Sequence, residues 1–485
     1  MKRRLFYMLI ILTAVEGSFG QFISAVGGDN RKAAKRPDPD KPTVIRLTVQ
    51  PADEPRPALK YQLLPSILDR TEGDAAALYY LAMTFTTREH TNKMRDRIRV
   101  WIKTPPKKLL EELPVDEARR VLSGYSAALR HIELAARRET CDWGLPIRTD
   151  GYNITLPSLG RYKELARVLA VKARLEMAEG KFDHAVRTLS TGYAMARHLA
   201  EGPTLVHDLV GVAITSLMSE QVQELIQSEG SPNMYWALAS LPRPVVSLRE
   251  AMDYESSSLY MAYPQLRGLA DKQLSPEQWR AMTDEFAKIR DMIHGEPSGT
   301  SAKLFMTAWA IKLYPEAKQS LISKGRMREQ VEAMPVQQVI AIHCLESYDY
   351  WKDELFKWYC LPYWQGREGM QKAGAAFRKW NKTNRGNPFT ALLPTLSRAY
   401  FIRVKTDRRI AALRCIEAVR MFAAKNEGRL PKRLDELTDA PVPIDPVTGK
   451  GFDYKVEGNT FTLDAPAPPG MLAKEGERYV VTIRK

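Results

Sequence analysis

The stretch from Arg409 to Asp464 limits most strongly what this chain folds into, because signals for a helix, a stop, a proline-rich turn and a hairpin follow one another in it. Apolar residues recur first at helical spacing, at Ala412, Cys415, Ile416, Val419, Phe422 and Ala423. Lys425 and then Gly428 give a helix C-terminal signal, a cation followed by a residue that tolerates the left-handed conformation. We therefore predict an amphipathic helix that ends near Lys425. The charged residues that fall largely off its apolar face are Arg408, Arg414, Glu417 and Arg420.

The residues after this helix predict extended chain and a small antiparallel sheet. Pro431 prevents the helix from resuming at once, and one short turn is expected near Leu434. The prolines of residues 441–446 hold that segment extended. Apolar and polar residues then alternate on both sides of the turn Gly458-Asn459, which predicts a hairpin, and 479–483 predicts a third strand.

This arrangement resembles the globular part of type II secretion pseudopilins, in which a helix also runs into a proline-containing turn and a small sheet. The matching residues are Gly428, Leu430, Pro431, Leu437, Asp445, Pro446, Gly449, Phe452 and Tyr454. The resemblance implies a pseudopilin-like α+β module over residues 398–485. It also suggests a role as an accessory of a secretion machinery, although likeness of fold does not carry function with it.

The N-terminus predicts export. Lys2, Arg3 and Arg4 precede an apolar run from Leu5 to Val15, and small residues follow up to Gly20. This is the pattern of a signal peptide over residues 1–20, since about 20 apolar residues are needed to span a bilayer. We expect a periplasmic or extracellular protein, with an uncleaved N-terminal membrane anchor as the alternative.

Composition is that of an ordinary globular protein, with 44% hydrophobic and 27% charged residues among 485. The formal net charge of +15 favours anionic envelope polymers or lipid surfaces, but a solvated surface of mixed charge explains it equally simply. No dense basic run with interleaved aromatic residues is present, so we expect no nucleic-acid partner. The four cysteines, Cys141, Cys344, Cys360 and Cys415, form either one or two disulfides or buried thiols.

The rest of the chain divides by composition into two parts. Residues 21–71 are rich in proline and read as a tether with short strands, at 44–49 and at 57–65. Residues 72–397 read as a mainly α-helical domain of helical hairpins. Its expected helices are 75–85, 115–139, 164–200 (a hairpin), 206–227, 245–260, 276–293, 301–323, 337–359 and, leading into the last module, 389–405. Pro315 is expected to kink or split the helix that contains it.

The hairpin at 164–200 is partly tetratricopeptide-like, because small and aromatic residues occupy Ala173, Gly180, Phe182, Ala185 and Leu189. No second unit of the same period follows in the sequence. A separate resemblance covers nearly the whole mature chain. The runs 57–65 and 73–80, together with the ending 445–449, resemble a family of uncharacterised exported bacterial proteins with a helical body. That family implies boundaries and no activity.

No catalytic or metal-binding motif can be assigned from the sequence, so we predict neither catalytic residues, nor a metal, nor a cofactor. The seven histidines form no H-E-x-x-H pattern, and the chain has no G-x-S-x-G, phosphate-binding or dinucleotide-binding motif. His207-Asp208 is the most suggestive pair, and a capped helix start explains it more simply than a catalytic base does.

The predicted ligand-binding residues come from two places. Asp253 and Glu255 combine acidic and aromatic neighbours, as a sugar site does. In the aromatic segment, Tyr348, Trp351, Leu355, Trp358 and Tyr359 share one helical face, which core packing explains. The rings left over, Tyr350, Tyr363 and Trp364, are expected to line a groove for glycan or peptide.

These observations favour an exported cell-envelope protein that binds or scaffolds and carries no evident catalytic chemistry. Its expected partner is an envelope protein or a glycan. The alternatives are a glycan-acting enzyme on a helical scaffold, with acids drawn from several helices, and an accessory of a secretion machinery.

Overall fold

The computed structural model describes residues 38–86, 88–104, 115–147, 154, 156, 159–272, 274–284, 300–384, 387–393 and 396–484. The predicted signal peptide therefore lies outside the described residues. The predicted fold class is confirmed, because the described chain is mainly helical with one small four-stranded sheet. It divides into two units, made up of Met1–Asp29, Leu145–Thr155 and Met252–Arg398 (unit 1) and of Asn30–Gly144, Leu156–Ala251 and Ala399–Lys485 (unit 2).

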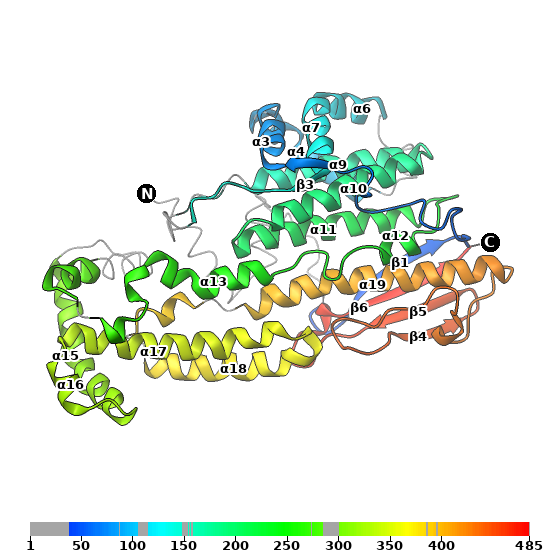
Figure 1. Ribbon diagram of the computed structural model, residues 1–485. Coiled ribbons are helices and arrows are strands. Elements are labelled where there is room, and N and C mark those ends of the chain that lie inside the picture. Colours follow the sequence, from blue (N-terminus) through cyan, green and yellow to red (C-terminus); the bar gives the residue numbers. More distant parts are fainter. Residues whose placement is uncertain are drawn as a thin grey trace. The chain divides into compact units, whose positions relative to one another are not determined.

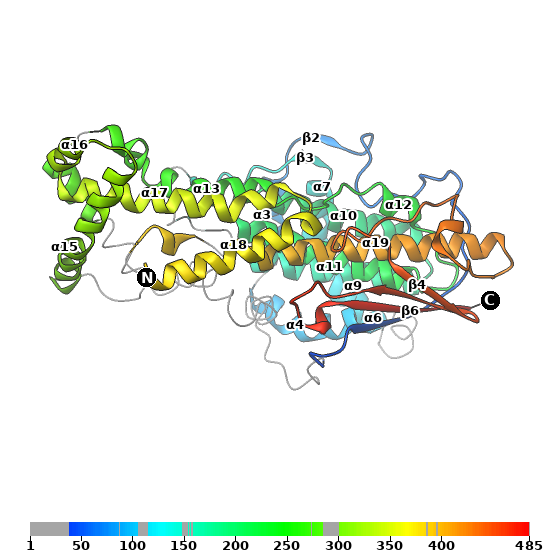
Figure 2. The same cartoon turned by 90° about the horizontal axis from the view of Figure 1, so that it is seen from below.

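Unit 1 is helical and has its own apolar core. Its helices are α13 (Arg249–Ala262), which starts at the boundary, α15 (Thr300–Ser323), α16 (Arg328–Ala333), α17 (Val336–Phe356), the short η4 (Lys357–Cys360) and α18 (Tyr363–Thr383). α17 and α18 lie side by side (Figures 1 and 2), and Trp351 of α17 packs on Phe377 and Trp380 of α18. This contact makes α17, η4 and α18 one helical hairpin.

Unit 2 joins a group of helices to the sheet. The helices are α3 (Ala76–Thr84), α4 (Arg88–Lys103), α6 (Val115–Gly124), α7 (Ser126–Ala136), α9 (Leu159–Ala178), α10 (Phe182–Ala200), α11 (Leu205–Leu225), α12 (Tyr235–Ala239) and α19 (Ser397–Lys425). The predicted hairpin at 164–200 is confirmed as α9 and α10, with Gly180 in the left-handed conformation at the turn. Two short strands, β2 (Thr71–Asp74) and β3 (Arg138–Thr140), pair in parallel beside α3 and α7.

The four-stranded sheet has the order β1-β6-β5-β4. The predicted hairpin and third strand are confirmed as β4 (Asp453–Glu457), β5 (Thr460–Ala465) and β6 (Glu477–Ile483). The strand expected at 44–49 is confirmed as β1 (Thr43–Val49), and it pairs in parallel with β6 as an edge strand. A segment at the start of the chain therefore completes the sheet at its end, and α19 runs along the sheet (Figures 1 and 2).

Several local predictions are wrong, each for a local physical reason. Residues 57–65 form turns instead of a strand, because their prolines lack amide donors for a ladder. The helix expected over 115–139 is two helices that meet at Tyr125. α15 continues through Pro315 without a split. No separate helix spans 389–405, because α19 runs unbroken from Ser397. Of the helix expected at 276–293, residues 276–284 are helical and the rest lie outside the described residues.

The prediction of a charged outer side for α19 is also wrong. Arg408, Glu417 and Arg420 are almost completely buried, and Arg414 nearly so. The reason is that α19 has the sheet on one side and helices of unit 2 on another, so its charged side faces protein partners instead of water. Arg408 donates two hydrogen bonds to the carboxylate of Asp445, Nε to Oδ1 at 2.8 Å and Nη2 to Oδ2 at 2.6 Å.

The Asp445-Pro-Val-Thr-Gly segment owes its form to this ion pair. The Asp445 carboxylate also accepts hydrogen bonds from the Val447 amide at 2.8 Å and from the Thr448 hydroxyl at 3.0 Å. The Gly449 amide closes the turn on the Asp445 carbonyl, and Gly449 has a φ of 71°. One buried carboxylate thus holds a surface turn and a central helix together.

Candidate functional site

The aromatic segment of unit 1 divides into a buried and an exposed set. Tyr348 and Trp351 are buried in the apolar core, where Tyr348 meets the ring of Tyr260 at 6.2 Å and Trp351 packs on α18. Tyr363 is buried at the start of α18. Tyr350, by contrast, is 59% exposed, and Trp364 is 42% exposed. Of the three rings predicted to line a groove, two therefore face solvent and one supports the helix start.

The two predicted acids lie on α13. Asp253 is exposed and Glu255 is half-buried. Burial first, and then the charge of Glu255, raises the pKa of Tyr254 to about 12. Glu255 also contributes to the raised pKa of Tyr348 after burial and the charges of Tyr260 and Asp349, so this acid lies toward the side of α17 that carries Tyr348. Tyr350 is two residues further along α17, and on a helix that spacing turns a side chain well away from Tyr348.

The predicted residues do not come together in one groove. Trp351, beside Tyr350, packs on Phe377, and Phe377 lies 14 residues after Tyr363 in α18. At 1.5 Å per residue, this separates the level of Tyr350 from that of Tyr363 by about 20 Å along the helix. Trp364 therefore belongs to a different part of the hairpin from Tyr350.

The corner between η4 and α18 is the best-defined part of this surface. We call Trp358, Leu361, Trp364, Gly366 and Gly369 the α18 corner. The Trp358 carbonyl oxygen would lie 2.5 Å from a Cβ placed at Gly366, and the Trp358 ring 2.4 Å from one at Gly369. Two glycines one turn apart thus let η4 pack against α18. Leu361, 39% exposed, and Trp364 are presented on this fixed corner.

We expect Gly366→Ala to lower the free energy of unfolding of unit 1 by about 1–3 kcal/mol, because the new methyl group meets a backbone oxygen that cannot rotate away. The measurement is urea unfolding of the full chain. Gly374→Ala, in the same helix, is the matched control: its Cβ meets only Arg378 Nη1 at 3.5 Å, so the gain in helix propensity should leave stability unchanged or slightly higher. Equal losses in both variants would contradict the close packing of the corner.

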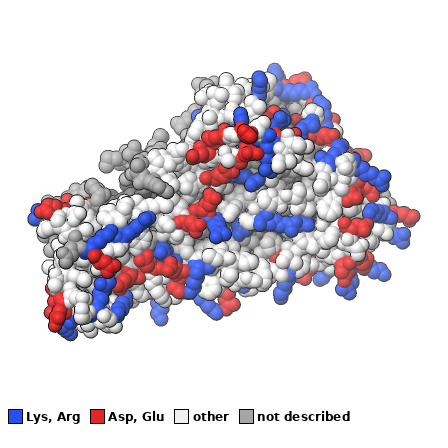
Figure 3. All heavy atoms as spheres, in the orientation of Figure 1, with Lys and Arg blue, Asp and Glu red and all other residues white. Residues whose placement is uncertain are grey.

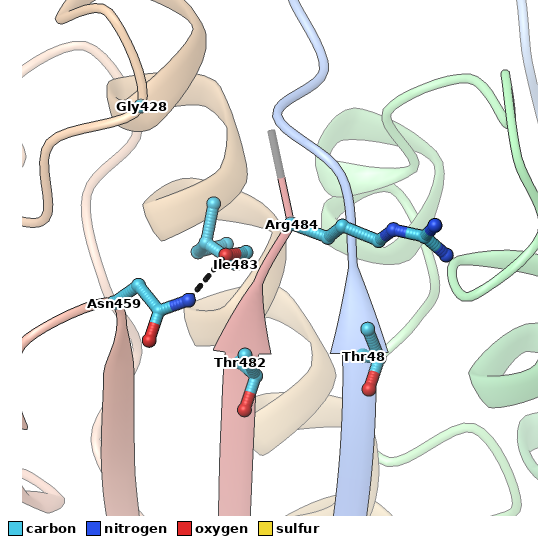
Figure 4. Close-up of a pocket in the computed structure, with 6 residues that line it drawn as sticks. All are labelled: Thr48, Gly428, Asn459, Thr482, Ile483 and Arg484. Carbon is cyan, nitrogen blue, oxygen red and sulfur yellow. Dashed lines mark hydrogen bonds between the residues drawn. The ribbon is translucent and has the colours of Figure 1, made fainter.

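A shallow pocket of about 350 Å³ lies in unit 2 at the end of the sheet, lined by Thr48, Gly428, Asn459, Thr482, Ile483 and Arg484. The Asn459 amide donates to the Ile483 carbonyl at 3.2 Å, and the Arg484 side chain extends away from Asn459 (Figure 4). The polar groups do not converge on one point. This pocket was not predicted from the sequence, because its lining comes from four distant segments.

The buried histidines of unit 2 are held in structural hydrogen bonds. His198 Nε2 lies 3.0 Å from the Arg138 carbonyl oxygen, which only accepts, so Nε2 carries the proton. His198 Nδ1 then accepts from the Tyr79 hydroxyl at 2.9 Å. His207, in the first turn of α11, lies 2.8 Å from the Thr204 hydroxyl through Nδ1. Burial lowers the pKa of each histidine to about 4. His207-Asp208 thus occupies a helix start.

The other chemical groups of the described chain follow the same pattern. All four cysteines are free; Cys141, Cys344 and Cys415 are buried, and Cys360 is exposed. Within the described ranges, no group of three or more His, Cys, Asp or Glu residues is placed to hold a metal ion. No described helix is long and apolar enough to cross a membrane. On the face drawn in Figure 3, basic and acidic side chains are interspersed.

Comparisons with protein-family models, with curated proteins and with solved structures find no match for this chain.

Proposed function

We propose that this chain is an exported cell-envelope protein that binds or scaffolds, and that the α18 corner is its binding surface. The observation that carries the proposal is the exposed Trp364 beside Leu361 on a corner fixed by Trp358 against two glycines. A rigid aromatic side chain loses little conformational entropy on binding, and tryptophan is enriched among the residues that dominate binding energy. The expected ligand is an envelope glycan or an envelope protein.

The N-terminal sequence supports the cellular location in this proposal, and the α+β module supports the architecture. The basic residues before the apolar run at 5–15 favour export, with an uncleaved anchor as the alternative. The likeness of residues 398–485 to pseudopilins keeps an accessory role in secretion as a second form of the same scaffold function.

A glycan-acting enzyme is the competing proposal, and the acids Asp253 and Glu255 are its candidate catalytic pair. Such an enzyme needs two carboxylates on opposite sides of a bound sugar. Tyr348 and Trp351, which an aromatic platform beside these acids would require, pack in the core instead. This favours the binding proposal over the enzymatic one.

We expect Trp364→Ala to weaken binding to isolated bacterial envelope about thirtyfold, the equivalent of about 2 kcal/mol for a central aromatic anchor. The measurement is retention of the full-length chain on envelope material at increasing protein concentration. Tyr350→Ala is the matched control, because Tyr350 is at least as exposed but lies at a different level of the hairpin. An equal effect of both variants would count against the α18 corner.

A further inference from the structure

A turn in unit 2 presents two aliphatic side chains almost entirely to solvent. Ile67 is 79% exposed and Leu68 is 93% exposed, which are the two highest values among the large hydrophobic residues of the described chain. Single exposed hydrophobic residues are common on protein surfaces. Two adjacent aliphatic residues at the tip of one turn are a different case, because both lose their contact with water together when the tip is covered.

This tip is held in shape by hydrogen bonds across the turn. The Asp69 amide donates to the Ser66 carbonyl oxygen at 3.0 Å, and the Ser66 hydroxyl donates to Asp69 Oδ2 at 2.6 Å. On either side the chain is fixed to the unit: Leu63 is fully buried, and the Thr71 amide donates to the Arg137 carbonyl oxygen at 2.8 Å as β2 begins. The aliphatic pair is therefore pre-organised for insertion into a partner.

The charges at the tip are balanced and lie behind it. Arg70 Nε donates to the Pro65 carbonyl oxygen at 3.3 Å, so its guanidinium group is fixed at the base of the turn. The Asp69 carboxylate is held by Ser66 within the turn. An aliphatic tip with a basic group at its base matches the layers of a membrane surface, where acyl chains lie beneath phosphate groups.

Two arguments favour a lipid surface over a pocket of a partner protein. Residues that dominate protein–protein interfaces are enriched in Trp, Tyr and Arg, and leucine is under-represented among them. Lipid acyl chains, in contrast, accept aliphatic side chains of any shape. We propose that Ile67 and Leu68 form a lipid-inserting tip through which unit 2 contacts a membrane surface. Because insertion here is driven by apolar burial and the charges balance, it does not require anionic lipid.

The test places an environment-sensitive fluorophore at the tip of the full-length chain. Cys360 is the exposed cysteine and the other three are buried, so Cys360→Ser leaves a background in which one added cysteine is labelled. Leu68→Cys in this background is labelled with nitrobenzoxadiazole. Leu59→Cys is the matched control, because Leu59 is a 58% exposed leucine on a separate turn.

We expect phosphatidylcholine vesicles to shift the emission of the label at position 68 to the blue and to leave the label at position 59 unchanged. Phosphatidylglycerol in the vesicles should change this little, and Ile67→Ser should reduce the shift at position 68. An unchanged emission at 68, or equal shifts at 68 and 59, would overturn the proposal. So would a shift at 68 produced by envelope protein and not by vesicles, since the tip would then fit a protein pocket. The α18 corner is not involved in this measurement, so its result is independent of the function proposed above.

Discussion

Asp445→Ala should lower the free energy of unfolding of unit 2 by about 3–5 kcal/mol, because it leaves the buried Arg408 guanidinium without its carboxylate. Arg408 keeps hydrogen bonds to the carbonyl oxygens of Ala465 and Pro466, which do not balance its charge. The Val447 amide and the Thr448 hydroxyl lose their acceptor at the same time. The turn at 445–449 and its attachment to α19 should therefore loosen together.

Urea unfolding of the full chain measures this loss, and hydrogen exchange of strands β5 and β6 locates it in unit 2. Asp464→Ala is the matched control. Asp464 also accepts two hydrogen bonds from one arginine, Arg478, but the Arg478 side chain is about half exposed. An exposed pair of this kind contributes about 0–1 kcal/mol. If both variants lose the same stability, burial of the Arg408–Asp445 pair does not matter as we describe.

Stability should also fall steeply in mild acid, because His198 and His207 are buried in neutral form. The folded state holds the pKa of each at about 4, below the ordinary value of 6.5. Between these values the unfolded chain binds protons that the folded chain does not. The stabilisation is therefore complete above about pH 6.5 and is lost as the pH falls toward about 4. At about 1.4 kcal/mol per unit, each histidine accounts for about 3 kcal/mol.

The measurement is urea unfolding at a series of pH values between about 7 and 4. His198→Gln should be less stable than the native chain near pH 7, because the hydrogen bonds to Tyr79 and Arg138 change. Its stability should nevertheless fall less steeply with acid, by the share of one proton. His184→Gln, at an exposed position of the same helix, should keep the native slope. An unchanged slope in His198→Gln would contradict the buried neutral histidine.

Local signals in the sequence were sufficient for much of the fold. The period of α9 and α10 with Gly180 between them, and the alternation around Gly458, located a helical hairpin and a β-hairpin. The edge strand at 43–49 was also predictable from its residues. Its partner was not, because β1 pairs with β6 more than 400 residues away, and no local pattern encodes that contact.

The burial of charged residues was the main feature that sequence pattern concealed. Arg408, Glu417 and Arg420 read as a solvated helix side, because burial of a charge depends on a partner elsewhere in the chain. Glu417 accepts from the Met234 amide and Arg420 donates to the Gln50 carbonyl oxygen, so the partners come from segments far from α19. Removing residues after 397 would take away this helix and the core that it fills.

The candidate site was predictable in its residue types but not in its geometry. Aromatic crowding at 348–364 correctly drew attention to Trp364 and Tyr350, and the exposed rings are among those expected to be left over from the core. α18 was not expected, because glycines and aromatic residues mask its period. Gly366 and Gly369, one helical turn apart and soon after Trp358, were the available signal for a close helix packing.

The most direct test of the proposed function is a single incubation of the full-length chain with isolated envelope material, in which bound protein and released soluble glycan are measured together. We predict that the chain is retained, that Trp364→Ala reduces retention while Tyr350→Ala does not, and that no glycan fragments accumulate with time. Accumulation of soluble fragments that Glu255→Gln or Asp253→Asn abolishes would contradict the binding function and establish the enzymatic one.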